Sequence, residues 1–416
     1  MDRDWKRQHS LWRRGGLSGL FAVIAQTALA ATTYTVQQSA KTNELEISVE
    51  RPAKAPVTSL VLRGARFGIA PQVEAPSCDG KPLVAAGKGR WKVPAECRNV
   101  SWKVPLEPSG AEPANAQRSL SMTNGVLLSE ASSLPRLDDA GPEKLSLPPG
   151  QNFPAAKDGL PLPPAGKPPL FVLLGVNPAE TRTADQIKLV YFFDNPAARS
   201  RVPDMAEHLA GLRWLRDRVP SDGPMRFSVL WLGVPKKLLS LGGAQGDGLL
   251  LVNYLASDTP EPFGKAMRLY VPLHEAMHQF AATGRKRPVW MEESLASYFA
   301  IRAVLAVTHD AAGAKALFER FKEGAKAFPE GLVAISSRVD ETGDQMAGIG
   351  AFYTKGVAFW DAVNMAMEKA GGQSLESRLT VLVNTDFDGD KTPDRLRTLL
   401  GVPPEIWAPI QKQYLD

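Results

Sequence analysis

The stretch HEAMHQ, residues 274 to 279, constrains the local fold of this chain most strongly. It places two of the chain's five histidines, His274 and His278, four residues apart, with Glu275 directly after the first. Residues four apart on an α-helix project from the same side, one turn apart, so both imidazoles can bind one ion. Glu275 points about 100° away and can reach a water beside that ion. The spacing therefore predicts a helix with two metal ligands and a general base; the alternative is a helix face that carries histidine twice by chance.

A third ligand is expected from the segment WMEESLASYF, residues 290 to 299. Glu293 stands fifteen residues after His278 and can reach the metal from an antiparallel second helix, and Glu292 is the alternative ligand. Two histidines and one carboxylate leave the fourth position of tetrahedral zinc open, which is typical of a catalytic site. We therefore predict one zinc ion per chain.

These motifs resemble those of the gluzincin zinc metallopeptidases. HExxHQ followed by WxxExxASYF is similar to the pattern of the aminopeptidase N and glycyl aminopeptidase families, in which the glutamate after Trp-x-x, here Glu293, is the third zinc ligand. Residues 352 to 360, FYTKGVAFW, are similar to the YxKG segment of the same families, which implies that Tyr353 supports the oxyanion of the tetrahedral intermediate. This chain has four fewer residues between the second histidine and the glutamate than aminopeptidase N, so we expect a shorter loop between the two helices.

The resemblance also implies a substrate role for the glycine-rich stretch GGAQGDG, residues 242 to 248. Aminopeptidases of these families have a glycine-rich edge strand in this place, and a glutamate on it holds the free amino group of the substrate. The glycines agree but the glutamate is missing, so Gly243, Gln245 and Asp247 are the candidate substrate-binding residues. Either Asp247 or Gln245 replaces the glutamate, or the substrate needs no free amino group, or the stretch is a hairpin without a substrate role.

Together these residues imply zinc-dependent hydrolysis of peptide bonds in a peptide or protein substrate, with aminopeptidase and endopeptidase action both open. His274, His278 and Glu293 would hold zinc, which lowers the pKa of a bound water toward 7. Glu275 would pass a proton from the water to the leaving amine, and Tyr353 would stabilise the oxyanion. The alternative is an exported zinc-containing protein of the same fold that binds a peptide or protein without turnover. Glu275 and Tyr353 argue against it, because a pure binding protein needs no general base.

The first thirty residues differ in character from the rest of the chain. Five basic residues within the first fourteen positions precede an uncharged stretch of sixteen residues that ends in Ala28-Leu29-Ala30, which is typical of a secretory signal peptide. An uncleaved anchor is the alternative, although a bilayer span needs about twenty residues. We therefore predict that residues 1–30 are a signal peptide and that the protein is exported to the periplasm or the extracellular space, with no membrane span after cleavage.

The net charge limits the kinds of partner that we expect. The first thirty residues carry five positive and two negative side chains, a net of +3, which leaves +2 of the chain's +5 for the rest. Without a run of lysine and arginine, this charge gives no reason to expect nucleic acid or an anionic membrane as a partner.

The two cysteines, Cys78 and Cys97, would meet an oxidising compartment after export, so we predict one disulfide bond; two free thiols are the alternative. The oligomeric state stays open.

The hydrophobic pattern divides the chain into a β-rich and a helix-rich part. From Thr33 to about Ser121, apolar and polar residues alternate as in strands. Ten of the 34 prolines lie between residues 131 and 169, which argues against a central strand or helix there and predicts an extended connection. Strand-like apolar runs follow, interrupted by one helix after Asp204, and helices dominate from about residue 269.

The predicted fold class is therefore α+β. A β-sandwich-like domain covers residues 31–180, including the proline-rich connection, and the resemblance implies a thermolysin-like zinc metallopeptidase domain with a helical C-terminal part at residues 181–416. The acidic stretch DFDGDKTPD, residues 386 to 394, begins a loop with Lys391 and Arg397 at the sixth and twelfth positions, where an EF-hand needs glycine and glutamate. We therefore favour a solvated turn over a calcium site. His208 and His309 have no metal-ligand spacing and are expected at the surface or in helix packing.

Overall fold

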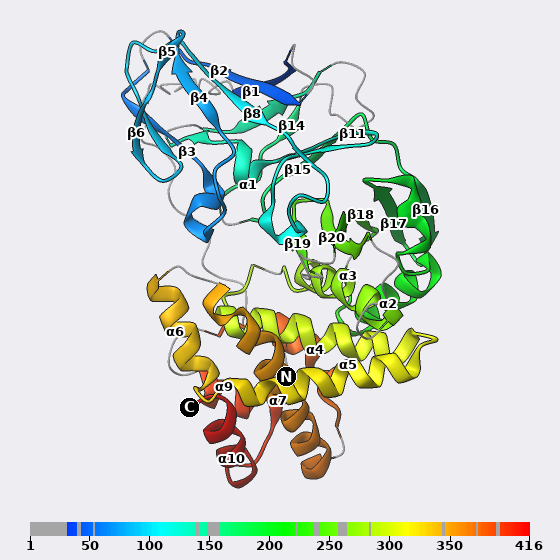
Figure 1. The fold of residues 1–416 in the computed structure, drawn as a ribbon. Coiled ribbons are helices and arrows are strands. Elements are labelled where there is room, and N and C mark those ends of the chain that lie inside the picture. Colours follow the sequence, from blue (N-terminus) through cyan, green and yellow to red (C-terminus); the bar gives the residue numbers. More distant parts are fainter. Residues whose placement is uncertain are drawn as a thin grey trace, which may run out of the picture. The chain divides into compact units, whose positions relative to one another are not determined.

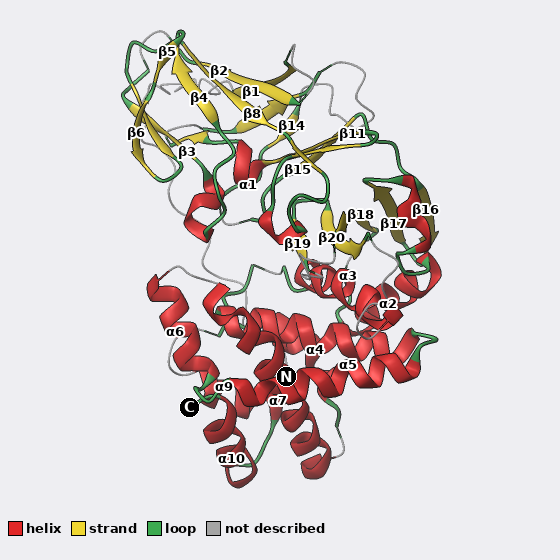
Figure 2. Cartoon of the chain, viewed as in Figure 1, coloured by secondary structure: helices red, strands yellow, loops and turns green. Residues whose placement is uncertain are grey.

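Strands dominate residues 32 to 255 and helices dominate residues 264 to 416 of the computed structural model (Figure 1), and the same division is visible when the chain is coloured by secondary structure (Figure 2). The structure describes residues 31–39, 43–52, 55–138, 141–148, 159–165, 167–221, 223–235, 242–256, 264–282, 284–342, 346–371, 373–387 and 392–416. Residues 31–416 form one compact unit. The predicted signal peptide, residues 1–30, lies outside the described residues.

A seven-stranded sheet begins the described chain. Its strands are β1 (Thr32–Gln38), β2 (Glu44–Glu50), β4 (Glu74–Cys78), β5 (Lys81–Pro82), β8 (Asn99–Pro105), β13 (Glu143–Ser146) and β14 (Leu160–Pro161). They follow the order β14-β13-β1-β2-β8-β4-β5, and every neighbouring pair is antiparallel except β1 with β13. The predicted alternation holds in β2, where Leu45, Ile47 and Val49 are buried while Glu46 and Glu50 are exposed.

A second sheet contributes to the same hydrophobic core. Its strands are β3 (Thr58–Val61), β6 (Val84–Gly87), β7 (Arg90–Val93) and β12 (Arg136–Leu137), in the order β12-β3-β7-β6. Leu60 and Val93 of this sheet share one core with Ile47 and Trp102 of the first. Burial of apolar side chains between two sheets gives the β-sandwich-like architecture that the alternation predicts.

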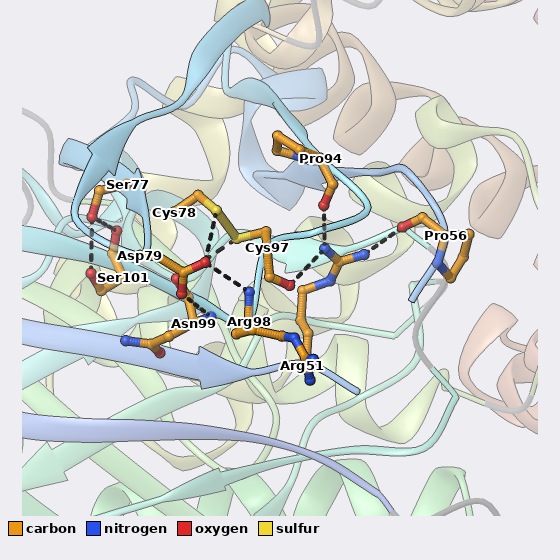
Figure 3. The surroundings of a disulfide bond; sticks show 10 residues. All are labelled: Arg51, Pro56, Ser77, Cys78, Asp79, Pro94, Cys97, Arg98, Asn99 and Ser101. Atoms are coloured by element: carbon orange, nitrogen blue, oxygen red, sulfur yellow. Dashed lines mark hydrogen bonds between the residues drawn. A yellow bond between two sulfur atoms is a disulfide. The ribbon is translucent and has the colours of Figure 1, made fainter. Parts of the chain in front are cut away.

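The predicted disulfide bond joins Cys78, at the end of β4, to Cys97, two residues before β8 (Figure 3). The two Cα atoms lie 5.6 Å apart, a normal separation for a disulfide. Asp79 stabilises the same corner, because its carboxylate accepts hydrogen bonds from the backbone N–H groups of Arg98 and Asn99. Arg51 donates to the carbonyl of Cys97 from the other side (Figure 3).

The proline-rich segment contains more regular structure than its composition predicts. β13 is paired with β1 on one side and with β14 on the other, so the prediction that no central strand forms here is wrong. The reason is local, because β13 contains no proline and Pro161 lies on the edge strand β14, where a missing N–H costs little. Arg136 holds the segment in place: its guanidinium donates to the carbonyl of Pro163 and pairs with Glu130 and Glu143.

Two further sheets connect the β-rich part to the helices. The third sheet consists of β9 (Glu107–Pro108), β10 (Leu120–Met122), β11 (Gly125–Ser129) and β15 (Phe171–Leu174), in the order β15-β11-β10-β9. The fourth consists of β16 (Glu180–Ala184), β17 (Ile187–Phe193), β18 (Met225–Val234), β19 (Gly243–Gln245) and β20 (Leu250–Leu255), in the order β16-β17-β18-β20-β19. In the fourth sheet β17, β18 and β20 are parallel, and the two edge strands are antiparallel to their neighbours.

The third and fourth sheets share a hydrophobic core. Phe171 and Leu173 from β15 pack with Leu230 from β18 and Leu251 from β20. Apolar side chains therefore join the two parts of the chain across the predicted domain boundary. That boundary, between residues 180 and 181, falls at the start of β16 and stays a prediction.

The helices lie mostly after the fourth sheet. They are α1 (Glu130–Ser133), α2 (Met205–Arg218), α3 (Gly264–Phe280), α4 (Val289–Val307), α5 (Ala311–Gly324), α6 (Leu332–Thr342), α7 (Met346–Gly371), α8 (Leu379–Val383), α9 (Thr392–Leu400) and α10 (Pro404–Tyr414). Short 3-10 helices are η1 (Arg63–Phe67), η2 (Ala114–Ala116), η3 (Pro196–Ser200), η5 (Ala325–Ala327) and η6 (Leu375–Arg378). α2 starts as predicted, because Asp204 accepts a hydrogen bond from the N–H of Ala206. Within the described part of the chain, none of the helices combines the length and the apolarity that crossing a membrane requires.

Candidate metal centre

The two histidines lie one turn apart on α3, as their spacing predicts. The helix is fixed by its apolar face, because Leu273, Ala276 and Met277 are completely buried in the large core of the helical part. α3 packs against α4 and against the edge strand β19 (Figure 1). His274 and Glu275 are consequently buried as well, although both side chains are polar.

Three donor atoms from α3 and α4 converge. Nε2 of His274 lies 3.2 Å from Nε2 of His278, and Oε2 of Glu293 lies 3.4 Å from the first and 3.7 Å from the second. Tetrahedral zinc with ligands at about 2.1 Å would set its ligand atoms about 3.4 Å apart. The spacing of the three atoms and the donor set of two imidazoles and one carboxylate therefore fit a zinc ion.

Glu292, the alternative third ligand, is not part of this group of donor atoms. Its carboxylate lies 3.6 Å from the guanidinium of Arg287, in the loop between α3 and α4. Burial raises the pKa of Glu292, and the positive charge of Arg287 opposes this rise. Neighbouring residues on a helix point about 100° apart, so Glu292 and Glu293 do not face the histidines together.

The charges of the protein's own groups set the protonation of this cluster. Burial lowers the pKa of His278, but the carboxylate of Glu293 outweighs burial and raises that pKa to about 9. Burial favours the neutral form of Glu293, yet the charge of His278 and hydrogen bonds from both histidines hold the pKa of Glu293 well below its usual range. Because only a neutral imidazole can bind a metal, zinc has to displace the proton that this pair holds.

Glu275 faces the edge strand β19. A Cβ atom on Gly243 would come within 2.8 Å of Cγ and Oε1 of Glu275, so only glycine lets the strand pass this close to the carboxylate. Burial raises the pKa of Glu275, while the charges of His274 and His278 lower it. A buried carboxylate of this kind suits a group that has to accept and return a proton near neutral pH.

Tyr353 reaches the same cluster from α7. Its ring lies 5.0 Å from the ring of His274, measured between centroids. Burial and the negative charges of Glu293 and Glu275 raise the pKa of Tyr353 well above its usual value. The hydroxyl therefore keeps its proton and can donate a hydrogen bond to a developing oxyanion.

The other residues of the YxKG segment have structural tasks. Nζ of Lys355 donates to the three backbone carbonyls of residues 328 to 330, at 2.6 to 3.4 Å, which anchors α7 to the turn after α5. A Cβ atom on Gly356 would overlap the side chain of Ser294, so glycine allows α7 to touch α4. Lysine and glycine thus hold the helix that carries Tyr353.

Two residues that the sequence reasoning missed, Ser297 and Tyr270, hold His274. Oγ of Ser297 lies 3.2 Å from Nδ1 of His274, and it accepts a hydrogen bond of 3.2 Å from the hydroxyl of Tyr270. When His274 binds a metal through Nε2, Nδ1 carries the proton and donates a hydrogen bond to Oγ of Ser297. The available signal was position, since Ser297 follows Glu293 by four residues and so lies on the same helix face.

The glycine-rich strand lies along α3, beside the cluster. Gln245 and His278 both line a cavity of about 180 Å³. Asp247 is exposed and is not among the described residues that line this cavity; its N–H donates to the carbonyl of Pro169. Position 246 has no room for a side chain, because a Cβ atom there would overlap the ring of Phe171.

The remaining candidates lie apart from this cluster. His208 is buried between α2 and β17, where Nδ1 lies 2.8 Å from the hydroxyl of Tyr191, and burial lowers the pKa of His208 to about 3. His309 is exposed. In the acidic stretch, Asp386 accepts a hydrogen bond from the N–H of Lys286, while residues 388–391 lie outside the described residues.

No protein-family model and no curated protein sequence matches the chain. Solved structures do match it. An aminopeptidase N family protein from Idiomarina loihiensis has a TM-score of 0.66 and 12% sequence identity, over 92% of this chain and 76% of that chain. A two-domain M1 zinc metallopeptidase variant bound to L-tryptophan has a TM-score of 0.52 and 14% identity, over 93% of both chains. This chain has the M1 zinc metallopeptidase fold.

A third structure agrees with this assignment. An M1 zinc metallopeptidase variant from Deinococcus radiodurans, bound to a Tyr-Ser-Ala substrate, has a TM-score of 0.50 and 15% identity, over 93% of this chain and 94% of that chain. At such identities the likeness concerns the fold. The predicted α+β class and the resemblance to gluzincin peptidases are confirmed at that level.

Proposed function

We propose that this chain is an exported zinc metallopeptidase that hydrolyses peptide bonds. The observation that carries the proposal is the convergence of His274, His278 and Glu293, whose donor atoms lie 3.2 to 3.7 Å apart. The M1 fold supports the zinc, and the neighbours that hold an amino acid or a peptide support a peptide substrate. Export rests on the character of the first thirty residues, and sequencing the mature N-terminus, expected at Ala31, tests it.

The residues that would hold zinc are His274 and His278 through Nε2 and Glu293 through its carboxylate. When bound, zinc lowers the pKa of a coordinated water and polarises the carbonyl of a substrate. Oγ of Ser297 would accept a hydrogen bond from the Nδ1–H of His274 and thereby fix the tautomer that leaves Nε2 available.

Two further side chains would carry out the proton transfer and the charge stabilisation. Glu275 accepts a proton from the attacking water and delivers it to the leaving amine, which its burial next to the cluster favours. Tyr353 donates its hydroxyl proton in a hydrogen bond to the oxyanion, since its raised pKa keeps the hydroxyl neutral. Gly243 leaves room for Glu275 beside the edge strand on which a substrate backbone would lie.

Hydrolysis of a mixed peptide library by the zinc-loaded protein tests the proposal. We expect cleavage that a chelator abolishes and that zinc restores. Glu275→Gln should retain zinc and lose at least about a hundredfold in rate, because it removes the general base without removing a ligand. Undiminished cleavage by Glu275→Gln would contradict the role of this residue. A protein that holds zinc and peptide but cleaves nothing would instead support a binding protein without turnover.

A further inference from the structure

The cavity beside His278 has one accessible charged group that the proposed mechanism does not use. Its volume is about 180 Å³, and most of its lining is apolar, including Met277, Leu295 and Ala296. Among the described lining residues, Glu292 is the acidic one and Arg287 is the basic one besides His278. The same pair also lines a second cavity of about 530 Å³.

The two charges of the pair differ in accessibility. The guanidinium of Arg287 donates to the carbonyls of Ala281, at 2.7 Å, and Val383, at 2.8 Å, and its side chain is only 4% exposed. The side chain of Glu292 is 41% exposed, and its carboxylate lies 3.6 Å from Arg287, beyond hydrogen-bond distance. The two terminal nitrogens of Arg287 therefore donate to the backbone, whereas Glu292 keeps acceptor capacity for another group.

Within the described lining, the glycine-rich strand contributes no acidic side chain to this cavity. Gln245 lines it from the glycine-rich strand and is neutral. At position 246 the ring of Phe171 fills the space that a side chain would need, and Asp247 does not line the described cavity. Glu293 and Glu275 already serve the metal cluster, which leaves Glu292 as the carboxylate that a substrate in this cavity would meet.

We infer that Glu292 is a specificity-determining residue, which binds a positively charged group of the substrate next to the scissile bond. This inference rests on the proposed peptidase function. The group is an ammonium or guanidinium, supplied either by the free amino terminus of a peptide or by a lysine or arginine side chain. A carboxylate that replaces water as the partner of such a cation gains a charge-assisted hydrogen bond. Glu292 thus acts on the substrate and not on the metal.

Peptide binding to the zinc-loaded Glu275→Gln protein tests the inference without any need for turnover. Calorimetry would compare a tripeptide with a free amino terminus, its N-acetylated form, and N-acetylated forms with lysine or norleucine. We expect a preference of about tenfold to a hundredfold for the peptides that carry the positive charge. Loss of affinity on acetylation identifies the amino terminus as the source, and a preference for lysine over norleucine identifies the side chain.

Glu292→Gln in the same background should abolish this preference and still bind one zinc ion. Glu50→Gln, which removes an exposed negative charge from β2, is the matched control and should leave the preference unchanged. Equal affinity of the Glu292→Gln protein and its parent for every peptide would overturn the inference. If Glu292→Gln does not fold, the peptide affinities of the Glu275→Gln protein alone test the inference. Equal affinity of that protein for charged and uncharged peptides would also overturn it. Failure of hydrolysis in the wild-type protein would contradict the proposed function and leave this binding test valid.

Discussion

The side chain of His274 shows how much of this centre depends on single residues outside the metal cluster. Its Nε2 faces His278 and Glu293, and its Nδ1 faces Ser297. The hydroxyl of Tyr270 donates a hydrogen bond to Ser297. A ligand that is held on both sides loses less freedom when a metal binds. The HExxH spacing predicted the ligands but not this support. Ser297 lies on the same face of α4 as Glu293, but the sequence did not show that its hydroxyl contacts both His274 and Tyr270 of α3.

Ser297→Ala should weaken zinc binding about tenfold or more, because His274 loses the acceptor that fixes its tautomer. The measurement is the zinc dissociation constant, from competition with a chromophoric chelator. Ser337→Ala is the control, since Ser337 is an exposed serine on α6 that bonds only to the carbonyl of Val333 among the interactions described. An unchanged dissociation constant for Ser297→Ala would show that Ser297 does not contribute to zinc binding through His274.

His208 should make the protein less stable in mild acid. Burial lowers the pKa of His208 from 6.5 to about 3, so between these values the unfolded chain binds a proton that the folded chain does not. The free energy of unfolding should therefore fall by about 1.4 kcal/mol per pH unit as the pH drops below about 6. This loss of stability is complete near pH 3.

Urea unfolding of His208→Gln at a series of pH values measures this contribution. The variant should show a shallower pH dependence than the wild type, and the two curves should run parallel above about pH 7. His309→Gln replaces an exposed histidine and should retain the wild-type slope. Identical slopes for all three proteins would show that His208 is not buried in the neutral form.

At the scale of elements, the centre depends on how closely α4 and α7 approach each other. The sequence predicted a second helix for Glu293 and mainly helical structure around Tyr353. It did not show that Ser294 and Gly356 form the contact between them, since that contact joins residues 62 positions apart. The helix α3 starts at Gly264, so Pro272 lies inside it. Burial of the apolar face of α3 offsets the cost of a proline within a helix.

Gly356→Ala should separate α7 from α4 and displace Tyr353. The new methyl group would overlap the side chain of Ser294, and we expect a loss of about 1–3 kcal/mol in the free energy of unfolding, together with a lower kcat. Gly371→Ala is the control on the same helix, because a Cβ at that position would meet no described residue beyond the helix's own backbone and its chain neighbours within 4 Å. Equal stability of the two variants, in thermal or urea unfolding, would contradict the close contact.

At the scale of the whole molecule, the sequence predicted the classes of structure better than their connections. Alternation predicted the β-sandwich-like part, and the motifs predicted the helices of the centre. The shared core of Phe171, Leu173, Leu230 and Leu251 could not be predicted, because its members are apolar in any fold and only pairing across the chain brings them together. The strand β13 was missed for a related reason, since a high local proline content hid four residues without proline.

Removal of the disulfide should destabilise the β-rich part. Cys78 and Cys97 close a loop with a sequence separation of 19, and a loop of this size contributes about 3 kcal/mol by restricting the unfolded chain. Cys78→Ser together with Cys97→Ser should therefore lower the denaturation midpoint, measured by urea unfolding. Reduction of the wild-type protein should have the same effect and should leave the double variant unchanged. A wild-type midpoint that does not respond to reduction would contradict this contribution.

The zinc content of two neighbouring variants tests the central claim most directly. Glu293→Gln and Glu292→Gln remove the same charge from adjacent positions of α4, but only Glu293 places a carboxylate oxygen among the histidine nitrogens. After purification in the presence of zinc and dialysis, elemental analysis should find about one zinc per chain in the wild type and in Glu292→Gln, and little in Glu293→Gln. Retention of zinc by Glu293→Gln, or its loss from Glu292→Gln, would contradict the metal centre described above.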